Sequence, residues 1–334
     1  MSRQAAIDIG TNSVRLLIAD VPDPLPFLPP ARGRSRRPGP SLVPTPVLRR
    51  LTITRLGEGL RGTGLILPRA AARTAAAVEE FVALATASGA ESPIVVATHA
   101  FRTASNPDEL LARLTLPIRT LSGDEEARLG YQGVLAGIGK PGRSARLLVV
   151  DIGGGSVELT VGNSTRIEGS CSLPIGAVVL TERFLSHDPP CEGETASLLE
   201  TVVQTLDPFF AGIARPPQRV FGVGGTITTM AAIEQRLTPY DPGRVHGFRL
   251  TRRAVDRITS MMLGLPLAAR QGLAGLQPER ADIIVAGALV LQSLLARLGA
   301  PGITVSEADL LWALVLLPHP GDGPPPTPGP RTPA

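Results

Sequence analysis

The chain has 334 residues, of which 43% are hydrophobic and 19% are charged, so it is long enough for two domains with sizeable cores. This balance excludes a chain that is disordered throughout. The formal net charge is a modest +4 at pH 7, and Lys140 is the only lysine, so arginine carries almost all of the positive charge. Guanidinium groups suit phosphate ligands, but the same bias is typical of a genome rich in Gly, Ala, Arg and Pro. We expect no nucleic acid polymer as a partner.

The cysteines and the apolar segments predict a reduced, cytoplasmic protein that does not enter a membrane. Cys171 and Cys191 form no CxxC pair, and the N-terminus lacks the pattern of a signal peptide. The longest apolar stretch, residues 283–295, is interrupted by Gln292 and Ser293 and is shorter than the roughly 20 residues that cross a bilayer. It is better interpreted as a buried helix.

In the first half of the chain, strand-like and helical segments alternate. Residues 4–10 and 14–21 are β-rich runs around a Gly-Thr-Asn turn, which predicts a hairpin. Residues 22–47 are rich in Pro and Arg and have no hydrophobic period, which predicts a poorly ordered insertion. Further along, the patterns predict strands at 51–60 and 93–102, and helices at 68–89 and 124–139.

The second half repeats this alternation. Residues 145–163 predict another hairpin and residues 219–234 a strand that turns into a helix. Helices are predicted at 178–185, 193–213, 251–263, 278–299 and 308–317, with a short strand at 302–307. We therefore expect an N-terminal domain over 1–120, a C-terminal domain over 121–300, a final strand and helix over 301–317 that could pack back on the first domain, and an unstructured tail over 318–334.

The two hairpins share one motif. "DIGTNSVRL" at residues 8–16 and "DIGGGSVEL" at 151–159 are 143 residues apart, a domain-sized distance. This repeat predicts an α/β protein made of two duplicated domains with a cleft between them. The clearest mismatch is that Arg15 occupies the place of Glu158.

The repeated turns have the chemistry of phosphate-binding loops. Small residues let successive backbone N–H groups face one anion, and a hydroxyl adds a donor. A carboxylate beside phosphate would repel it unless a hard divalent cation intervenes, so Asp8, Asp151 and Glu158 are candidate metal ligands. Each turn alone could be a plain structural turn, but a matched pair favours function. A third turn, with Gly224, Gly225 and Thr226, opens a helix and also suits an anion.

In their chain order, these turns and the segments between them resemble the Ppx/GppA family of exopolyphosphatases and guanosine pentaphosphate phosphatases, within the actin-like ATPase superfamily. The matching segments span residues 5 to 311. They are AIDIGTNSVRLLIAD, RLGEGL, VATHAFRTASN, LSGDEEARLGYQGV, LLVVDIGGGSVELTVG, GVGGTITTMAAI, ERADIIVAGALVL and ITVSEADL. The resemblance implies two actin-like (ribonuclease H-like) domains with mixed β-sheets flanked by helices and an interdomain cleft.

The resemblance also implies roles for individual residues. Glu126 is the first choice for the catalytic carboxylate that activates water, and Glu125 is the competitor. Residues adjacent on a helix point about 100° apart, so we expect only one of the two to face the cleft. Asp151 and Glu158 organise Mg²⁺ or Mn²⁺ and water, and Arg102 contacts substrate phosphate. As a separate hypothesis from the mismatch between the repeats, Arg15 either adds positive charge near the substrate or has a salt-bridging or exposed-strand role. The turns that grip phosphate are Gly10, Thr11, Asn12 and Ser13, and Gly153, Gly154, Gly155 and Ser156.

The leading functional hypothesis is an exopolyphosphatase that releases terminal phosphate from inorganic polyphosphate. The first alternative is a pppGpp 5'-phosphohydrolase that gives ppGpp, because both substrates end in an exposed phosphoanhydride. A non-catalytic phosphate-ligand sensor is a weaker alternative, since the acids are retained. The resemblance also makes a homodimer plausible.

Overall fold

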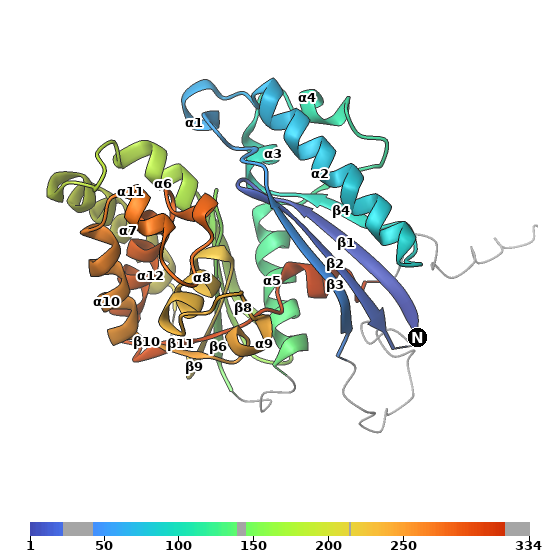
Figure 1. Cartoon of the computed structure of the whole chain (residues 1–334). Coiled ribbons are helices and arrows are strands. Elements are labelled where there is room, and N and C mark those ends of the chain that lie inside the picture. The colour runs from blue at the N-terminus through green and yellow to red at the C-terminus, as the bar shows by residue number, and fades with distance from the viewer. Residues whose placement is uncertain (23–42, 139–144, 214, 318–334) are drawn as a thin grey trace, which may run out of the picture.

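Two β-sheets, one from each half of the chain, organise the fold (Figure 1). The computed structural model describes residues 1–22, 43–138, 145–213 and 215–317. The first sheet has the order β3-β2-β1-β4-β5 and is mixed. Its strands are β1 (Ser2–Ile9), β2 (Ser13–Val21), β3 (Thr45–Ile53), β4 (Ile94–Ala97) and β5 (Arg119–Thr120). β1 pairs antiparallel with β2 and parallel with β4, so it is the centre of this sheet.

The second sheet repeats this plan and has the order β10-β11-β9-β6-β7-β8. β6 pairs antiparallel with β7 and parallel with β9, as β1 does with β2 and β4. The strands are β6 (Leu147–Ile152), β7 (Val157–Gly162), β8 (Ile167–Leu173), β9 (Arg219–Val223), β10 (Arg249–Thr251) and β11 (Gly302–Val305). The predicted duplicated α/β architecture is therefore confirmed, and the second copy has one more antiparallel edge strand.

Helices cover both sheets (Figure 1). In the first half they are α1 (Leu60–Thr63), α2 (Pro68–Ala87), α3 (His99–Thr103), α4 (Asp108–Leu111) and α5 (Gly123–Gly137). In the second half they are α6 (Ala177–Phe184), α7 (Glu192–Ala211), α8 (Gly225–Glu234), α9 (Pro242–Val245), α10 (Arg252–Leu263), α11 (Leu267–Gln271), α12 (Ile284–Leu298), α13 (Leu310–Leu314) and a 3-10 turn at Pro278–Arg280.

The apolar stretch at 283–295 forms most of α12, which is buried in the core of the second half. Within the described ranges, no helix has both the length and the apolar character needed to cross a membrane.

Helices α5 and α13 pack together between the two sheets (Figure 1). α5 contacts β6, β7 and β8, whereas α13 contacts β1 and β2 of the first sheet. Leu129 of α5 shares one core cluster with Leu17 of β2 and Leu314 of α13. The segment 301–317 thus contributes its strand to the second sheet and its helix to the first.

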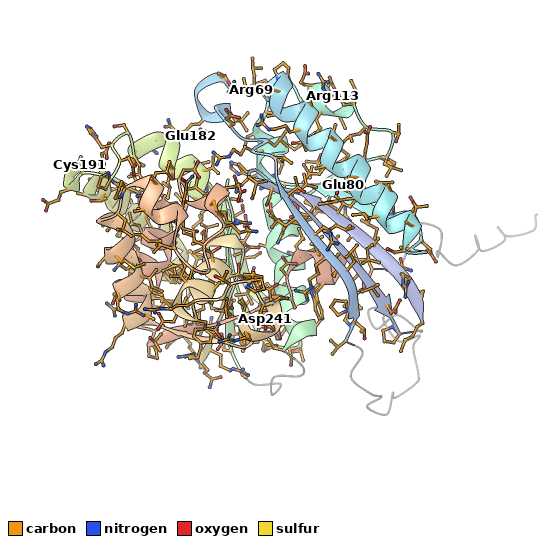
Figure 2. The ribbon with its side chains drawn as sticks, in the orientation of Figure 1. Arg69, Glu80, Arg113, Glu182, Cys191 and Asp241 are labelled. Carbon is orange, nitrogen blue, oxygen red and sulfur yellow. The ribbon has the colours of Figure 1, made fainter. Side chains whose placement is uncertain are left out.

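Contacts also cross between the halves away from this core. The Arg55 guanidinium donates to Asp282 at 2.6 Å, and the Gly59 N–H donates to Glu182 at 3.0 Å. Glu182 lies on α6, on the side of the second half that faces α1 (Figure 2). These contacts place the glycine turns of the two halves opposite each other.

The C-terminal boundary predicted for the insertion at 22–47 was wrong, because the last residues of that range already belong to a strand. Residues 23–42 lie outside the described residues, as does the tail at 318–334, but Thr45 already begins β3. Pro46 pairs with Ala19 in the ladder between β2 and β3. A proline-rich composition suggests a loop, yet β3 is an edge strand, where a missing N–H is tolerated.

Replacing Gly133 with Ala should destabilise the fold by about 1–3 kcal/mol, because the new methyl group would be forced into packed backbone. A Cβ at Gly133 would lie 2.5 Å from the carbonyl carbon of Asp309 and would overlap its oxygen. Gly130 on the same helix is the matched control, because a Cβ there meets nothing within 4 Å. Urea unfolding should therefore show a loss for Gly133→Ala and no loss for Gly130→Ala. Equal free energies of unfolding for the two variants would contradict this packing.

Candidate active site

A cavity of about 420 Å³ is lined by residues of both halves, and all three glycine turns reach it. Most of the predicted site residues line this cavity: Asp8, Gly10, Thr11, Asn12, Ser13, Arg15, Glu126, Asp151, Gly153, Gly154, Gly155, Ser156, Glu158, Gly224, Gly225 and Thr226. Glu125 and Arg102 are the two predicted residues that do not. The fold thus collects these side chains from two equivalent hairpins, from the start of α5 and from the start of α8.

The two repeated turns have the same backbone geometry and touch each other. The Gly10 N–H donates to the Ser13 carbonyl at 3.0 Å, and the Gly153 N–H donates to the Ser156 carbonyl at 3.0 Å. A Cβ at Gly154 would lie 3.1 Å from the Cβ of Asn12 in the other turn. Glycine is therefore favoured there, because a Cβ would make Asn12 of the facing turn move by a few tenths of an ångström.

The third turn also depends on glycine. Gly224 has φ +87°, and a Cβ on it would lie 2.7 Å from the Ile152 carbonyl oxygen and would overlap the Asp151 carboxylate. Gly225 then begins α8, whose first N–H groups are free of partners within the helix. This places the N-terminus of a ten-residue helix beside Asp151, where it can bind an anion.

Glu125 is used to cap α5 and is not available to the cavity. Its carboxylate accepts hydrogen bonds from the Ser122 N–H at 2.9 Å and from Arg119 at 2.6 Å, while its own N–H donates to Ser122 Oγ. This reciprocal pair is a capping box. The hydrogen bonds from Ser122 and Arg119 lower the pKa of Glu125 to about 2. Glu125 therefore stays ionised and faces outward.

Glu126 points the other way, into the cavity. Its carboxylate accepts from Arg102 Nη1 at 2.6 Å, and the same nitrogen donates to the Leu121 carbonyl at 2.8 Å. Burial, aided by the charges of Asp8 and Asp151, raises the pKa of Glu126 to about 7 although Arg102 opposes the shift. Such a carboxylate can accept a proton near neutral pH. Arg102, which the resemblance expects to contact phosphate, holds the Glu126 carboxylate in this structure.

Two further acids of the cavity have raised pKa values. Burial and the charges of Asp309 and Asp8 raise the pKa of Asp151 to about 7, against the influence of Arg15. Burial and the charges of Glu126 and Asp151 raise the pKa of Glu158, whose Oε1 accepts from Ser172 Oγ at 2.6 Å. The acids repel one another, which is costly without a positive partner.

Arg15 lies between the carboxylates of Asp8 and Asp309. It donates to Asp8 Oδ2 at 2.6 and 3.0 Å, and it forms an ion pair with Asp309 at the start of α13. Of the two roles considered for Arg15, this geometry is that of the salt bridge. Sequence reasoning missed Asp309, although an Asp before an apolar run is a signal for a helix N-cap, and its Oδ1 does accept from the Leu311 N–H at 3.0 Å.

The acids around the cavity fit an ion of the Mg²⁺ or Mn²⁺ class. Asp8 Oδ1 is buried and has no hydrogen-bond partner among the described residues. Burial also raises the pKa values of Asp151 and Glu158, which means that their ionised forms are destabilised without a nearby cation. Among the described acids of the cavity, no group of three has carboxylate oxygens that all lie within 4.8 Å of one another, so the acids do not form a closed cage of protein ligands. Mg²⁺ is typically held by one or two carboxylates plus phosphate oxygens and water, so such an open set suits it.

Arg280 is a cavity residue to which sequence reasoning assigned no role, although it lies in the quoted segment ERADIIVAGALVL. Its side chain is buried beside Gly225, where a Cβ would overlap its guanidinium, and it donates to Gln277 at 2.8 Å. No carboxylate within 4 Å pairs with it among the described residues, and burial lowers its pKa to about 10. A buried arginine without an acidic partner, next to a helix N-terminus, is suited to phosphate.

His99 is another lining residue whose role the sequence left open. Its ring lies against Gly155, where a Cβ would be 2.7 Å from His99 Cγ. Burial and the nearby Arg102 lower the pKa of His99 to about 4, so its imidazole is neutral at pH 7. It can therefore offer one N–H donor to a phosphate without adding charge.

The chain is similar to known proteins over nearly all of its length. The model of the Ppx/GppA phosphatase family matches residues 36–310. Exopolyphosphatase 2 of Mycobacterium tuberculosis is 36% identical over 330 residues, which cover 95% of this chain and 98% of that protein.

Solved structures agree with this. The crystal structure of the Aquifex aeolicus member of the Ppx/GppA family has a TM-score of 0.75 at 30% identity and covers 94% of this chain and 96% of that one. An exopolyphosphatase from Cytophaga hutchinsonii has a TM-score of 0.81 at 25% identity, with 93% and 96% covered. The family match, the relatives and the two-fold repeated sheet agree, and the chain belongs to the Ppx/GppA phosphatase family.

Proposed function

We propose that this protein is an exopolyphosphatase, which hydrolyses the terminal phosphoanhydride bond of inorganic polyphosphate and releases orthophosphate. The observation that carries the proposal is the position of Glu126, a carboxylate with a pKa of about 7 in a cavity lined by three glycine turns. A relative that covers nearly the whole chain has the name Exopolyphosphatase 2, which supports polyphosphate as the substrate.

In the proposed reaction, the residues of the cavity bind the end of the polymer and activate water. Backbone N–H groups of the turns at 10–13 and 153–156, other than those of Gly10 and Gly153, bind neighbouring phosphates, and Arg280 adds positive charge beside the third turn. Glu126 accepts a proton from the attacking water, and Arg102 holds its carboxylate in position. The water oxygen forms a bond to the terminal phosphorus while the bridging P–O bond breaks, and the shortened polyphosphate leaves.

We propose Mg²⁺ or Mn²⁺ as the cofactor, held by Asp151 and Glu158, with Asp8 offering its unpartnered oxygen. When bound, such an ion would partly neutralise the phosphate oxygens and stabilise the negative charge that develops on them in the transition state of phosphoryl transfer. The three carboxylates orient water on the side of the cavity that Glu126 faces. Their mutual repulsion explains why a cation is favoured there.

The acid limb of kcat/KM should move to lower pH as the Mg²⁺ concentration rises. Glu126 and Asp151 have pKa values of about 7, so both gain protons as the pH falls below that value. Activity then decreases, because the base and the ion ligands need to be deprotonated. Since the cation binds the deprotonated form, it competes with protons. Phosphate release from about pH 5 to about pH 9, at low and high Mg²⁺, measures this shift. A midpoint independent of Mg²⁺ would exclude Asp151 as a ligand.

The substrate is decided by assaying phosphate release from polyphosphate and from pppGpp in parallel with the same enzyme preparation. We expect the higher kcat/KM with polyphosphate. A higher value with pppGpp would replace the proposal by the nucleotide phosphohydrolase. Tight binding of either compound without any release would replace it by a sensor, provided that Mg²⁺ or Mn²⁺ is present.

A further inference from the structure

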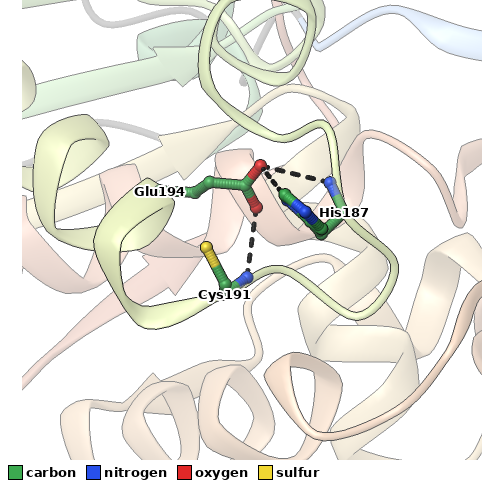
Figure 3. A group of neighbouring side chains, drawn as sticks. All are labelled: His187, Cys191 and Glu194. Atoms are coloured by element: carbon green, nitrogen blue, oxygen red, sulfur yellow. Dashed lines mark hydrogen bonds and ion pairs between the residues drawn. The ribbon is translucent and has the colours of Figure 1, made fainter.

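Three potential metal ligands of different chemistry lie together at the start of α7, and none of them lines the cavity (Figure 3). His187 and Cys191 belong to the loop between α6 and α7, and Glu194 is in the first turn of α7. One nitrogen, one sulfur and one oxygen from these side chains lie within 4.8 Å of one another. The set is His-x3-Cys-x2-Glu in sequence, so a single short loop supplies all three groups.

Hydrogen bonds hold the loop in this arrangement. Glu194 Oε1 accepts from the Ser186 N–H at 2.8 Å, from Ser186 Oγ at 2.6 Å and from the His187 N–H at 3.1 Å. Asp188, between the ligands, accepts from Arg270 at 2.8 Å and from the Leu267 N–H at 2.7 Å. The loop is thus tied to α7 at one side and to α11 at the other. Such preorganisation removes much of the cost of assembling a site.

A helix cap explains only part of this geometry. Glu194 Oε2 accepts from the Cys191 N–H at 3.1 Å, as the third residue of a capping box does. Capping needs no imidazole, yet His187 Nδ1 lies 2.9 Å from Glu194 Oε1. This contact brings the imidazole of His187 beside the carboxylate of Glu194, so two possible ligands of different chemistry are already adjacent. Among the described residues, Glu194 Oε2 accepts only from the Cys191 N–H, so this oxygen keeps a lone pair for an ion.

The donor set selects the class of ion. Thiolate, imidazole and carboxylate together suit Zn²⁺ and its analogue Co²⁺, whereas Mg²⁺ takes oxygen ligands. We propose that His187, Cys191 and Glu194 form a surface site for a zinc-class transition metal, with the fourth position open to water. The His187 side chain is 70% exposed and Cys191 is exposed as well, so an ion can enter from solvent. Binding releases the thiol proton of Cys191 and forms a metal–sulfur bond.

A Co²⁺ titration of the full chain tests the site without relying on enzymatic activity. Cobalt bound to a thiolate gives a sulfur-to-metal charge-transfer band in the near ultraviolet. We expect this band in the wild type, its loss in Cys191→Ser, and its displacement by Zn²⁺. The matched control is Cys171→Ser, because Cys171 is the other free cysteine and lies on β8, so this variant should keep the band.

His187→Ala should weaken Co²⁺ binding at least about tenfold, because the loss of a direct ligand costs at least as much affinity as the loss of an outer-shell partner. Circular dichroism of each variant verifies that the protein is folded. The proposal is overturned if the wild type gives no band, if the band survives in Cys191→Ser, or if His187→Ala binds Co²⁺ as tightly as the wild type. Phosphate release should be unchanged in the Cys191 and His187 variants, so failure of this site is separable from failure of the proposed hydrolase.

Discussion

Replacing Glu126 with Gln should lower kcat for phosphate release by about 10²- to 10⁴-fold, the usual contribution of a general base. Glutamine keeps the size of the side chain and can still accept a hydrogen bond from Arg102, but it cannot take a proton from water. Because the phosphate-binding turns remain intact, KM should change little. Steady-state assays with polyphosphate give both constants, and thermal unfolding verifies that the variant is folded.

Glu125→Gln is the matched control for this experiment, since the two residues are adjacent on α5. Glu125 caps the helix and binds Arg119, so its loss should cost about 0.5–2 kcal/mol of stability and leave kcat near the wild-type value. A kcat that falls equally in both variants, or only in Glu125→Gln, would remove Glu126 from its role.

Asp151→Asn should abolish activity and at the same time stabilise the metal-free protein. The folded state raises the pKa of Asp151 from 3.8 to about 7, so the folded protein binds this proton more tightly than the unfolded chain does. The contribution of Asp151 to the free energy of unfolding is therefore greatest below about pH 4 and falls as the pH rises toward 7. Asparagine removes the buried charge, and a gain of about 1 kcal/mol would raise Tm by roughly 2–4 °C near neutral pH.

The stabilisation should be seen with a chelator present, and it should shrink as the pH is lowered toward 4. Glu80→Gln is the control, because Glu80 is an exposed acid on α2 (Figure 2) and should leave both Tm and kcat unchanged. A lower Tm for Asp151→Asn in the metal-free protein would mean that Asp151 is a stabilising charge and not a ligand held ready for a cation.

The duplicated fold could be predicted from the sequence because the signal was local and occurred twice. The turns at 8–16 and 151–159 are nearly the same, and each joins two strong β-patterns. The choice between Glu125 and Glu126 was left open, yet Ser122 followed three residues later by Glu125 is itself a capping-box pattern. That pattern could have placed Glu125 outside the cavity.

Other parts of the site had no such signal. Arg280 and Asp309 reach the cavity from segments far along the chain from the first turn, and no spacing rule joins them to Asp8 or Arg15. The partner of Arg102 could not be inferred either, because it depends on how α3 packs against α5. The start of β3 was misplaced because proline at an edge strand looks like a loop in composition.

In the proposed reaction, the cavity that Glu126 faces uses water to cleave a phosphoanhydride. The most direct test is polyphosphate hydrolysis in water enriched in oxygen-18, with the released orthophosphate analysed by mass spectrometry. Each orthophosphate should carry a single oxygen atom from solvent, and Glu126→Gln should release almost no orthophosphate. Orthophosphate without solvent oxygen, or no release from polyphosphate by a folded enzyme supplied with Mg²⁺ or Mn²⁺, would contradict it.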